Sequence, residues 1–324
     1  MNETNRSSLT ILKRRSLLKA AAVSALASTL AGPLKALADD KATGQAESGG
    51  PTEPKALPYV DRIGLQLYTL RNQMAEDPET TLRAVAQAGY QQVELMRIDE
   101  DAIRLAAMAR DNGLAVHSAF MNWKAITSPG SPGGPGVEET IELAERIGLR
   151  HIVFGYIAKD ARDTLDKIRK IASNANEAGE KTRDAGMRLC YHNHSFEFKK
   201  LDGKRAAFDE FIKRFDPQKV EFELDVFWAK LGGRDPIHLM RHLAARISQV
   251  HLKNLKADVP VIYDEGQVPH DAFQEVGDGV IDMPAIMRLA KRIGVDQCHV
   301  EQDQSPAPLE SIVQSIDFLK KQSA

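Results

Sequence analysis

The feature that most constrains the fold of this chain is a regular alternation after residue 61, in which short apolar runs are each followed by a stretch with helical spacing. Eight such pairs occur. The predicted strands cover residues 62–70, 91–96, 114–120, 151–156, 187–194, 220–227, 247–254 and 297–303. Strands that alternate with helices predict a parallel sheet, because parallel neighbours need a crossover connection and a helix usually supplies it.

Proline and glycine mark the ends of several predicted helices. Pro78 begins one helix and Gly89 follows it, while Pro236 and Pro308 begin two others. Eight strand–helix units in about 260 residues predict an α/β fold of the (β/α)8 TIM barrel class. A doubly wound sheet is the alternative, but it usually has a glycine-rich phosphate turn after its first strand, and residues 67–74 contain no glycine.

The stretch MRLCYHNHSFEF, residues 187–198, begins like a buried strand and ends in bases and acids. The carboxyl ends of the strands carry the chemistry in a TIM barrel, so polar side chains are expected at that point. His192 and His194 are two residues apart, which places them on the same side of a strand. We expect both histidines to face the lumen.

Three further predicted strands end in groups that bind metals. These groups are Asp225, His251 and Glu301. Together with Glu197 they provide three carboxylates and one imidazole, a set that suits a divalent ion such as Mn²⁺, Mg²⁺, Co²⁺ or Zn²⁺. The sequence therefore predicts one divalent metal site, and Lys253 is expected on the same face as His251 because it lies two residues further along the strand.

Six motifs in this order resemble the sugar isomerase/epimerase family with a xylose isomerase-like barrel, from about Asp61 to the end of the chain. The motifs are IGLQLYTLR, YHNHSFEF, FELDVFWAKLGGRDP, VHLKN, EVGDGVID and HVEQD. The resemblance implies one divalent metal held by residues of the fifth to eighth strands, and Asp225, His251 and Glu301 match that pattern. The ketose epimerases have a glutamate inside the fifth strand, where this chain has histidines. The remaining ligand is therefore either Glu197 or one of the two histidines.

The departure at the fifth strand also affects the expected mechanism. Ketose epimerases of the family use two glutamates on opposite faces of the substrate, and only Glu301 is matched here. Imidazole, with an ordinary pKa near 6.5, is an effective base at neutral pH. We predict that His192 or His194 removes a proton alpha to a ketone that the metal polarises. Lys253 is predicted to stabilise the enolate or to protonate a leaving oxygen.

Removal of such a proton has three outcomes, which are epimerisation, aldose–ketose isomerisation and elimination. Histidine-rich members of the family resemble enzymes that cleave or hydrate 3-keto-glycosides by elimination. The predicted function is thus that of a metal-dependent isomerase, epimerase or lyase acting on a sugar or keto-sugar. Two alternatives are a non-catalytic sugar-binding barrel and a metal phosphodiesterase similar to the barrel endonucleases that act at abasic DNA sites.

Three aromatic side chains are candidates for substrate contacts. Trp228 follows Asp225 by three residues, and its ring would stack on a sugar or pack at the rim of the core. Tyr68 is expected near the end of the first strand, where it lines the mouth of the barrel or supports a turn. His117 is expected near the end of the third strand, within reach of a substrate.

The first 58 residues differ in composition from the barrel. Residues 13–20 read KRRSLLKA, an apolar run follows over 20–31, and Ala36-Leu37-Ala38 resembles a cleavage site. This pattern predicts a twin-arginine signal peptide over residues 1–38, a flexible leader over 39–58 and the barrel over 59–324. The protein would then be periplasmic or exported via the twin-arginine pathway. A basic amphipathic helix and an uncleaved anchor are the alternatives for the N-terminal segment.

Charge narrows the range of partners. Residues 1–38 carry six Lys or Arg and one Asp or Glu, so cleavage would move the formal net charge from −2 to −7. An acidic domain is a poor candidate for binding nucleic acid, because that affinity depends on neutralising phosphates. We expect a small carbohydrate as the partner, with no nucleic acid and no membrane contact after cleavage; the oligomeric state is open. The two cysteines, Cys190 and Cys298, are predicted not to form a disulfide because their strands are not neighbours.

Overall fold

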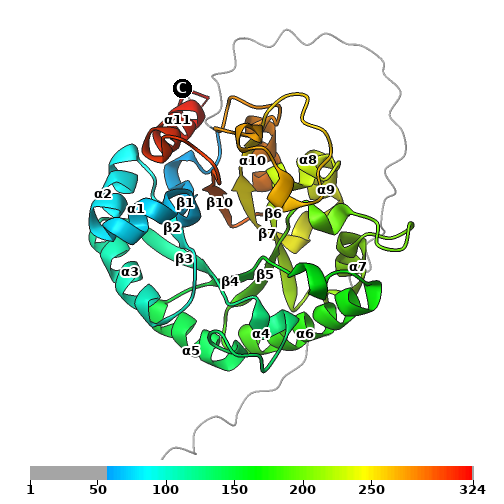
Figure 1. Ribbon diagram of the computed structural model, residues 1–324. Helices are drawn as coiled ribbons and strands as arrows, with labels where there is room; N and C mark the ends of the chain where they lie inside the picture. Colours follow the sequence, from blue (N-terminus) through cyan, green and yellow to red (C-terminus); the bar gives the residue numbers. More distant parts are fainter. Residues whose placement is uncertain (1–56, 323–324) are drawn as a thin grey trace, which may run out of the picture. The chain divides into compact units, whose positions relative to one another are not determined.

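Eight parallel strands close into a barrel in the computed structural model, which describes residues 57–322 (Figure 1). The order around the barrel is β1, β10, β7, β6, β5, β4, β3 and β2. The strands are β1 (Gly64–Gln66), β2 (Gln92–Leu95), β3 (Ala115–Phe120), β4 (His151–Phe154), β5 (Arg188–His192), β6 (Val220–Asp225), β7 (Ile247–Leu252) and β10 (Gln297–Val300). The predicted (β/α)8 barrel is thereby confirmed.

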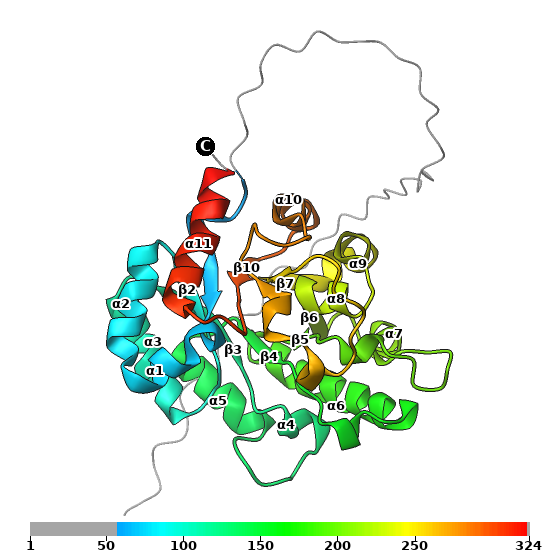
Figure 2. The same cartoon turned by 45° about the horizontal axis from the view of Figure 1, so that its top comes forward.

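Helices surround the strands in both views (Figures 1 and 2). They are α1 (Arg71–Glu76), α2 (Pro78–Ala88), α3 (Glu100–Asp111), α4 (Lys124–Thr127), α5 (Val137–Ile147), α6 (Leu165–Asp184), α7 (Ala207–Arg214), α8 (Val226–Leu231), α9 (Pro236–Leu243), α10 (Met283–Ile293) and α11 (Pro308–Lys321). Capping side chains explain several starts. The Asp77 and Asp235 carboxylates accept backbone N–H groups in the first turns of α2 and α9.

The two faces of the barrel strands have different chemistry. Outward side chains are mainly apolar and pack against the helices; the ring of Tyr191 on β5, for example, lies 4.8 Å from Phe211 on α7. Several inward side chains are polar, and all of them are buried. They include Gln66, Glu94, Ser118, His192, Glu223, Gln249 and His251. A lumen that contains this much hydrogen-bonding capacity needs internal partners for each group.

Some strands are shorter than the sequence predicts. The predicted first strand runs to residue 70, but β1 ends at Gln66 and a 3-10 turn covers Leu67–Leu70. The Gln66 side chain accepts the N–H of Tyr68 at 3.0 Å, which helps to turn the chain. The fifth strand ends at His192, so His194 lies beyond it.

A small additional sheet follows β7 at the carboxyl ends of the barrel strands. Strands β8 (Asn254–Leu255) and β9 (Phe273–Gln274) pair in antiparallel fashion, and the sequence pattern did not predict them. The segment between them contains two 3-10 turns, Glu265–Gln267 and His270–Ala272. Within residues 57–322, no helix combines the length and apolar character that a membrane crossing needs. The predicted signal peptide and nearly all of the predicted leader lie outside the described residues.

Candidate metal and substrate site

Four ligand-type side chains meet at the carboxyl ends of neighbouring strands. They are His192 on β5, Asp225 on β6, His251 on β7 and Glu301 just after β10. One donor atom from each lies within 4.8 Å of the others, and all four side chains are buried. Three of the four predicted ligands are thus brought together, with His192 as the fourth member of the cluster.

Glu197 lies outside this cluster and has other partners. It sits on the 3-10 turn Phe196–Phe198, where its two carboxylate oxygens accept the backbone N–H of His194 at 3.0 Å and one accepts the hydroxyl of Tyr191. Burial raises the pKa of Glu197 to about 7, against the opposing effect of these hydrogen bonds. The contacts of Glu197 therefore fix the backbone between His194 and the turn.

The donor set of the cluster fits a divalent cation. Asp225 Oδ1 accepts the N–H of Trp228 at 2.8 Å, whereas Oδ2 is buried, accepts no hydrogen bond and faces the Lys253 ammonium at 3.2 Å. His251 Nδ1 lies 3.0 Å from Glu301 Oε2. Two carboxylates and two imidazoles, all buried and convergent, are ligands for a hard or borderline divalent ion.

Lys253 completes the charged centre of the site. Its side chain is 1% exposed. Its ammonium lies 2.7 Å from Glu301, 2.8 Å from Asp303 and 3.2 Å from Asp225. Burial by itself would lower the pKa of Lys253, but the three carboxylates outweigh burial and raise that pKa well above its ordinary value. Lys253 is therefore a fixed positive charge beside the cluster.

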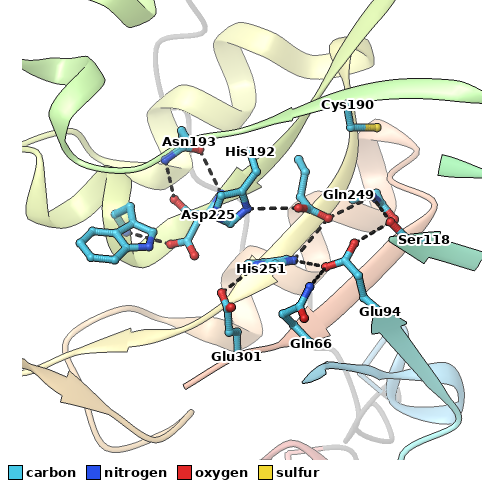
Figure 3. A network of polar contacts seen from close by, with 12 residues as sticks. Gln66, Glu94, Ser118, Cys190, His192, Asn193, Asp225, Gln249, His251 and Glu301 are labelled. Carbon is cyan, nitrogen blue, oxygen red and sulfur yellow. Dashed lines mark hydrogen bonds and ion pairs between the residues drawn. The ribbon is translucent and has the colours of Figure 1, made fainter. Parts of the chain in front are cut away.

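A buried hydrogen-bond network in the barrel lumen fixes the orientation of the His251 ring (Figure 3). His251 Nε2 lies 2.7 Å from Glu94 Oε2. The same carboxylate accepts hydrogen bonds from Gln66 at 2.7 Å and from Ser118 at 2.5 Å. Because one ring nitrogen of His251 faces Glu94, the other is directed to the cluster, which is the usual arrangement for a metal-binding histidine.

His192 is oriented in the same way by a second glutamate. Its Nδ1 lies 3.1 Å from Glu223 Oε2, and Gln249 donates to the other Glu223 oxygen at 2.9 Å. Nε2 of His192 is then the nitrogen left for a ligand. Asn193 links the two strand ends, because its side chain hydrogen-bonds the backbone N–H and C=O of Asp225 at 3.1 and 3.2 Å.

A second convergent group lies deeper in the lumen. Its members are Glu94, Glu223, His251 and His299. Each carboxylate oxygen of the two glutamates already accepts a hydrogen bond or faces a histidine nitrogen. This group therefore supports the cluster of His192, Asp225, His251 and Glu301. No role was predicted for Glu94 or Glu223 from the sequence, although an acid flanked by apolar residues, as in VEL and FEL, is a detectable signal, because a buried carboxylate needs partners.

A cavity of about 510 Å³ opens beside the cluster. His192, His194, Lys253 and Glu301 line it, so both predicted catalytic histidines and the lysine share one space. The rings of the two histidines are 5.2 Å apart, although only one lies within the strand.

Aromatic rings hold His194 in place. Its ring stacks on Phe196 at 5.4 Å and lies 5.1 Å from Trp228. Its Nδ1 is buried without a hydrogen-bond partner. Burial and the charge of Lys253 lower the pKa of His194 to about 3, so the ring is neutral at pH 7.

The three predicted substrate-contact residues have different positions. Tyr68 and Trp228 line the cavity, and Trp228 is the more buried of the two. His117 does not line it. It lies inside β3 next to Ser118, whose hydroxyl points into the lumen, so the His117 side chain takes the opposite face because strand residues alternate. The prediction for His117 is not supported by this position.

The segment between β8 and β9 contributes further lining residues, including Glu265, Val268 and His270. Arg162 donates to both carboxylate oxygens of Glu265 at 2.8 Å, and Tyr156 donates to one of them at 3.1 Å. The guanidinium also lies 3.4 Å from the ring centroid of Phe196. These contacts tie the segment to the loop after β4, and no sequence spacing predicted them.

Comparisons with known proteins agree with this architecture. A family model described as xylose isomerase-like TIM barrel matches residues 82–322. The chain is 27% identical over 172 residues to an inosose dehydratase of Lacticaseibacillus casei, a match that covers 48% of this chain and 56% of the relative. The chain thus spans little more than half the length of the curated relatives that it matches.

Two solved structures share the fold at lower sequence identity. A sugar phosphate isomerase/epimerase from Parabacteroides distasonis ATCC 8503 has a TM-score of 0.64 at 24% identity, covering 86% of this chain and 97% of that one. The IOLI protein with a bound zinc atom has a TM-score of 0.54 at 16% identity, covering 81% and 96%. With the family model matching most of the described residues, the chain belongs to the xylose isomerase-like TIM barrel family.

Proposed function

We propose that this protein is a divalent-metal-dependent enzyme that removes a proton next to the ketone of a sugar or cyclic polyol. The observation that carries the proposal is the convergence of His192, Asp225, His251 and Glu301 beside a cavity. His192 and Glu301 line that cavity together with Lys253 and His194. Similarity to inosose dehydratases supports a ketone with neighbouring hydroxyl groups as the substrate, and it favours elimination of water over epimerisation and isomerisation.

The metal would be held by the four clustered residues. When bound, it would supply Lewis acidity that polarises the substrate ketone and makes the adjacent C–H more acidic. His192 and His251 are pre-oriented for this task by Glu223 and Glu94. The hydrogen bonds from the two glutamates to the histidine rings are already formed, so the rings would not have to rearrange when a metal binds.

His194 is the proton acceptor in this proposal. Its neutral ring faces the cavity between Phe196 and Trp228, and the nearby charge of Glu301 favours its protonated form. A ring with a low pKa is a weak base, so proton transfer depends on the acidity of the substrate C–H. Lys253 stabilises the negative charge that develops on the substrate oxygen. In an elimination, the electron pair of the broken C–H bond forms a C=C bond to the next carbon, and the hydroxyl there leaves as water with the proton returned from His194. The product is an unsaturated ketone.

The test is incubation of the metal-loaded protein with an inosose, simple ketoses and 3-keto-glucosides in heavy water. Products would be followed by NMR and mass spectrometry. The expected result is exchange of the alpha proton, with loss of water from the inosose or a related keto-polyol. Exchange without dehydration would indicate an epimerase or isomerase. A protein that binds these compounds without any exchange would be a sugar-binding barrel, and the proposal would be wrong.

A further inference from the structure

We infer that the cavity binds two linked rings, with the reacting ring at the metal cluster and a second ring, glycosyl or aryl, on an outer subsite formed by Trp123 and Tyr156. The position of the reacting ring rests on the proposed function. The outer subsite rests on separate observations, which concern the length of an aromatic wall, the exposure of Trp123 and the unused donors of two indoles.

The first observation is a continuous row of rings along one wall of the cavity. Trp123 lies 5.3 Å from Tyr156, Tyr156 lies 6.0 Å from His194, and His194 lies 5.1 Å from Trp228. All four residues line the cavity. Successive rings meet edge-on or tilted, and the row extends over three such steps, which is more than the width of a single pyranose.

The row runs from the buried end of the site toward its mouth. Trp228 is 4% exposed and belongs to the hydrophobic core, and His194 packs against it. Trp123 is half-buried and does not belong to the core. It follows the end of β3 by three residues, where the ammonium of Lys124 lies 5.6 Å from its ring centroid. A large aromatic ring that the core does not use and that faces a cavity is typical of a ligand contact.

The third observation concerns hydrogen bonds. Within the described residues, neither Trp123 nor Trp228 donates a hydrogen bond through its indole N–H. Both indole nitrogens are accessible to solvent, so each can donate to a bound ligand. Because both side chains line the cavity, one unused donor is available at each end of the row for a ligand hydroxyl.

The size and remaining lining of the cavity agree with a two-ring ligand. A volume of about 510 Å³ lies in the range of pockets that enclose drug-sized molecules. Polar groups occur beyond the metal cluster as well, since Glu265, His270 and Gln304 also line the cavity. A ligand confined to the cluster would leave these groups and Trp123 without a contact.

The test is equilibrium binding to the metal-loaded full chain with ligands that contain no ketone and do not react. Methyl glucoside supplies one ring, cellobiose supplies two sugar rings, and phenyl glucoside supplies a sugar and an aromatic ring. We expect one or both two-ring ligands to bind roughly 2- to 10-fold more tightly than methyl glucoside, the range expected for one added stacking contact. Cellobiose and phenyl glucoside distinguish a glycosyl from an aryl second ring.

Trp123→Ala should remove this advantage and leave the affinity for methyl glucoside unchanged, whereas Trp123→Phe should keep most of it. Tyr263→Ala is the matched control, because Tyr263 is an exposed aromatic outside the cavity, and it should change nothing. Equal affinity for one-ring and two-ring ligands, no measurable binding of either two-ring ligand, or equal weakening of all ligands by Trp123→Ala would overturn the inference. Failure of the proposed function would appear separately, as absence of proton exchange with keto-substrates.

Discussion

At the scale of single residues, the site depends on histidines that are fixed from outside the cavity. His192 faces Glu223 through Nδ1, and His251 faces Glu94 through Nε2. The other nitrogen of each ring is therefore directed toward the cluster. His194 has no such glutamate; its Nδ1 is unpartnered and its ring is held by aromatic packing. The difference in support indicates a difference in role between His192 and His194.

Substitution of the two histidines should separate these roles. His194→Gln should lower turnover by about 10²- to 10⁴-fold, the usual contribution of a general base, while metal content stays near that of the parent protein. His192→Ala should instead release metal, because it removes one of four clustered donors. Metal content measured by elemental analysis, together with alpha-proton exchange, distinguishes the two outcomes.

Thermal unfolding provides the control for this pair, since each variant should keep a cooperative transition. Near-normal exchange in both variants would mean that neither histidine is the base. Glu301 would then be the next candidate, and the two-glutamate epimerase mechanism would regain support.

At the scale of elements, the close contact of β4 with β5 positions His192. Gly155 follows β4, and a Cβ atom there would lie 2.6 Å from Phe120 Cε1 and 2.9 Å from His192 Cβ. Gly155→Ala should therefore displace His192, cost about 1–3 kcal/mol through overpacking and lower metal affinity. Gly136→Ala is the control, because its added Cβ meets nothing within 4 Å. Urea unfolding and metal titration of both variants measure the effect; equal behaviour would contradict this account of β4.

The segment between β8 and β9 depends on a different contact. Arg162 and Glu265 are 10% and 19% exposed, so their ion pair is partly shielded from water. Arg162→Ala should lower the local stability of the segment by about 1.5–3 kcal/mol, the usual contribution of a hydrogen bond to a charged group. Cleavage of residues 256–272 by added protease should therefore increase. Arg83→Ala removes an exposed ion pair with Glu79 and should have no such effect. Unchanged cleavage of the Arg162 variant would show that other contacts hold the segment.

The barrel was predictable from the sequence because hydrophobic alternation and helix boundaries are local signals. Asp225 and His251 were identifiable for a similar reason, since both occur where a predicted strand ends. Glu94 was missed because its function depends on partners from other strands, which local spacing does not reveal. The Arg162–Glu265 pair joins residues 103 positions apart, so only the folded structure brings it into view.

At the scale of the whole molecule, the two cysteines report on the integrity of the barrel. Cys190 and Cys298 are free and buried, and two strands separate β5 from β10. Burial raises the pKa of both thiols, to about 12 for Cys298. The native protein should therefore not react with Ellman's reagent, and unfolding in urea should release two equivalents. Rapid labelling of the native protein would show that the barrel opens locally at these strands.

The N-terminal segment supplies the last prediction. We propose that Arg14 and Arg15 direct export through the twin-arginine pathway, which carries folded proteins. That route suits a chain whose proposed metal ligands come from the ends of four separate strands, because the cluster forms only after folding. Changing both arginines to lysine should keep the precursor in the cytoplasm, as measured by fractionation and mass spectrometry. Lys19→Arg is the control, since it preserves charge outside the paired arginines and should leave export unchanged. Arrival of the mature form in the periplasm at the normal rate from the double-lysine variant would contradict this assignment.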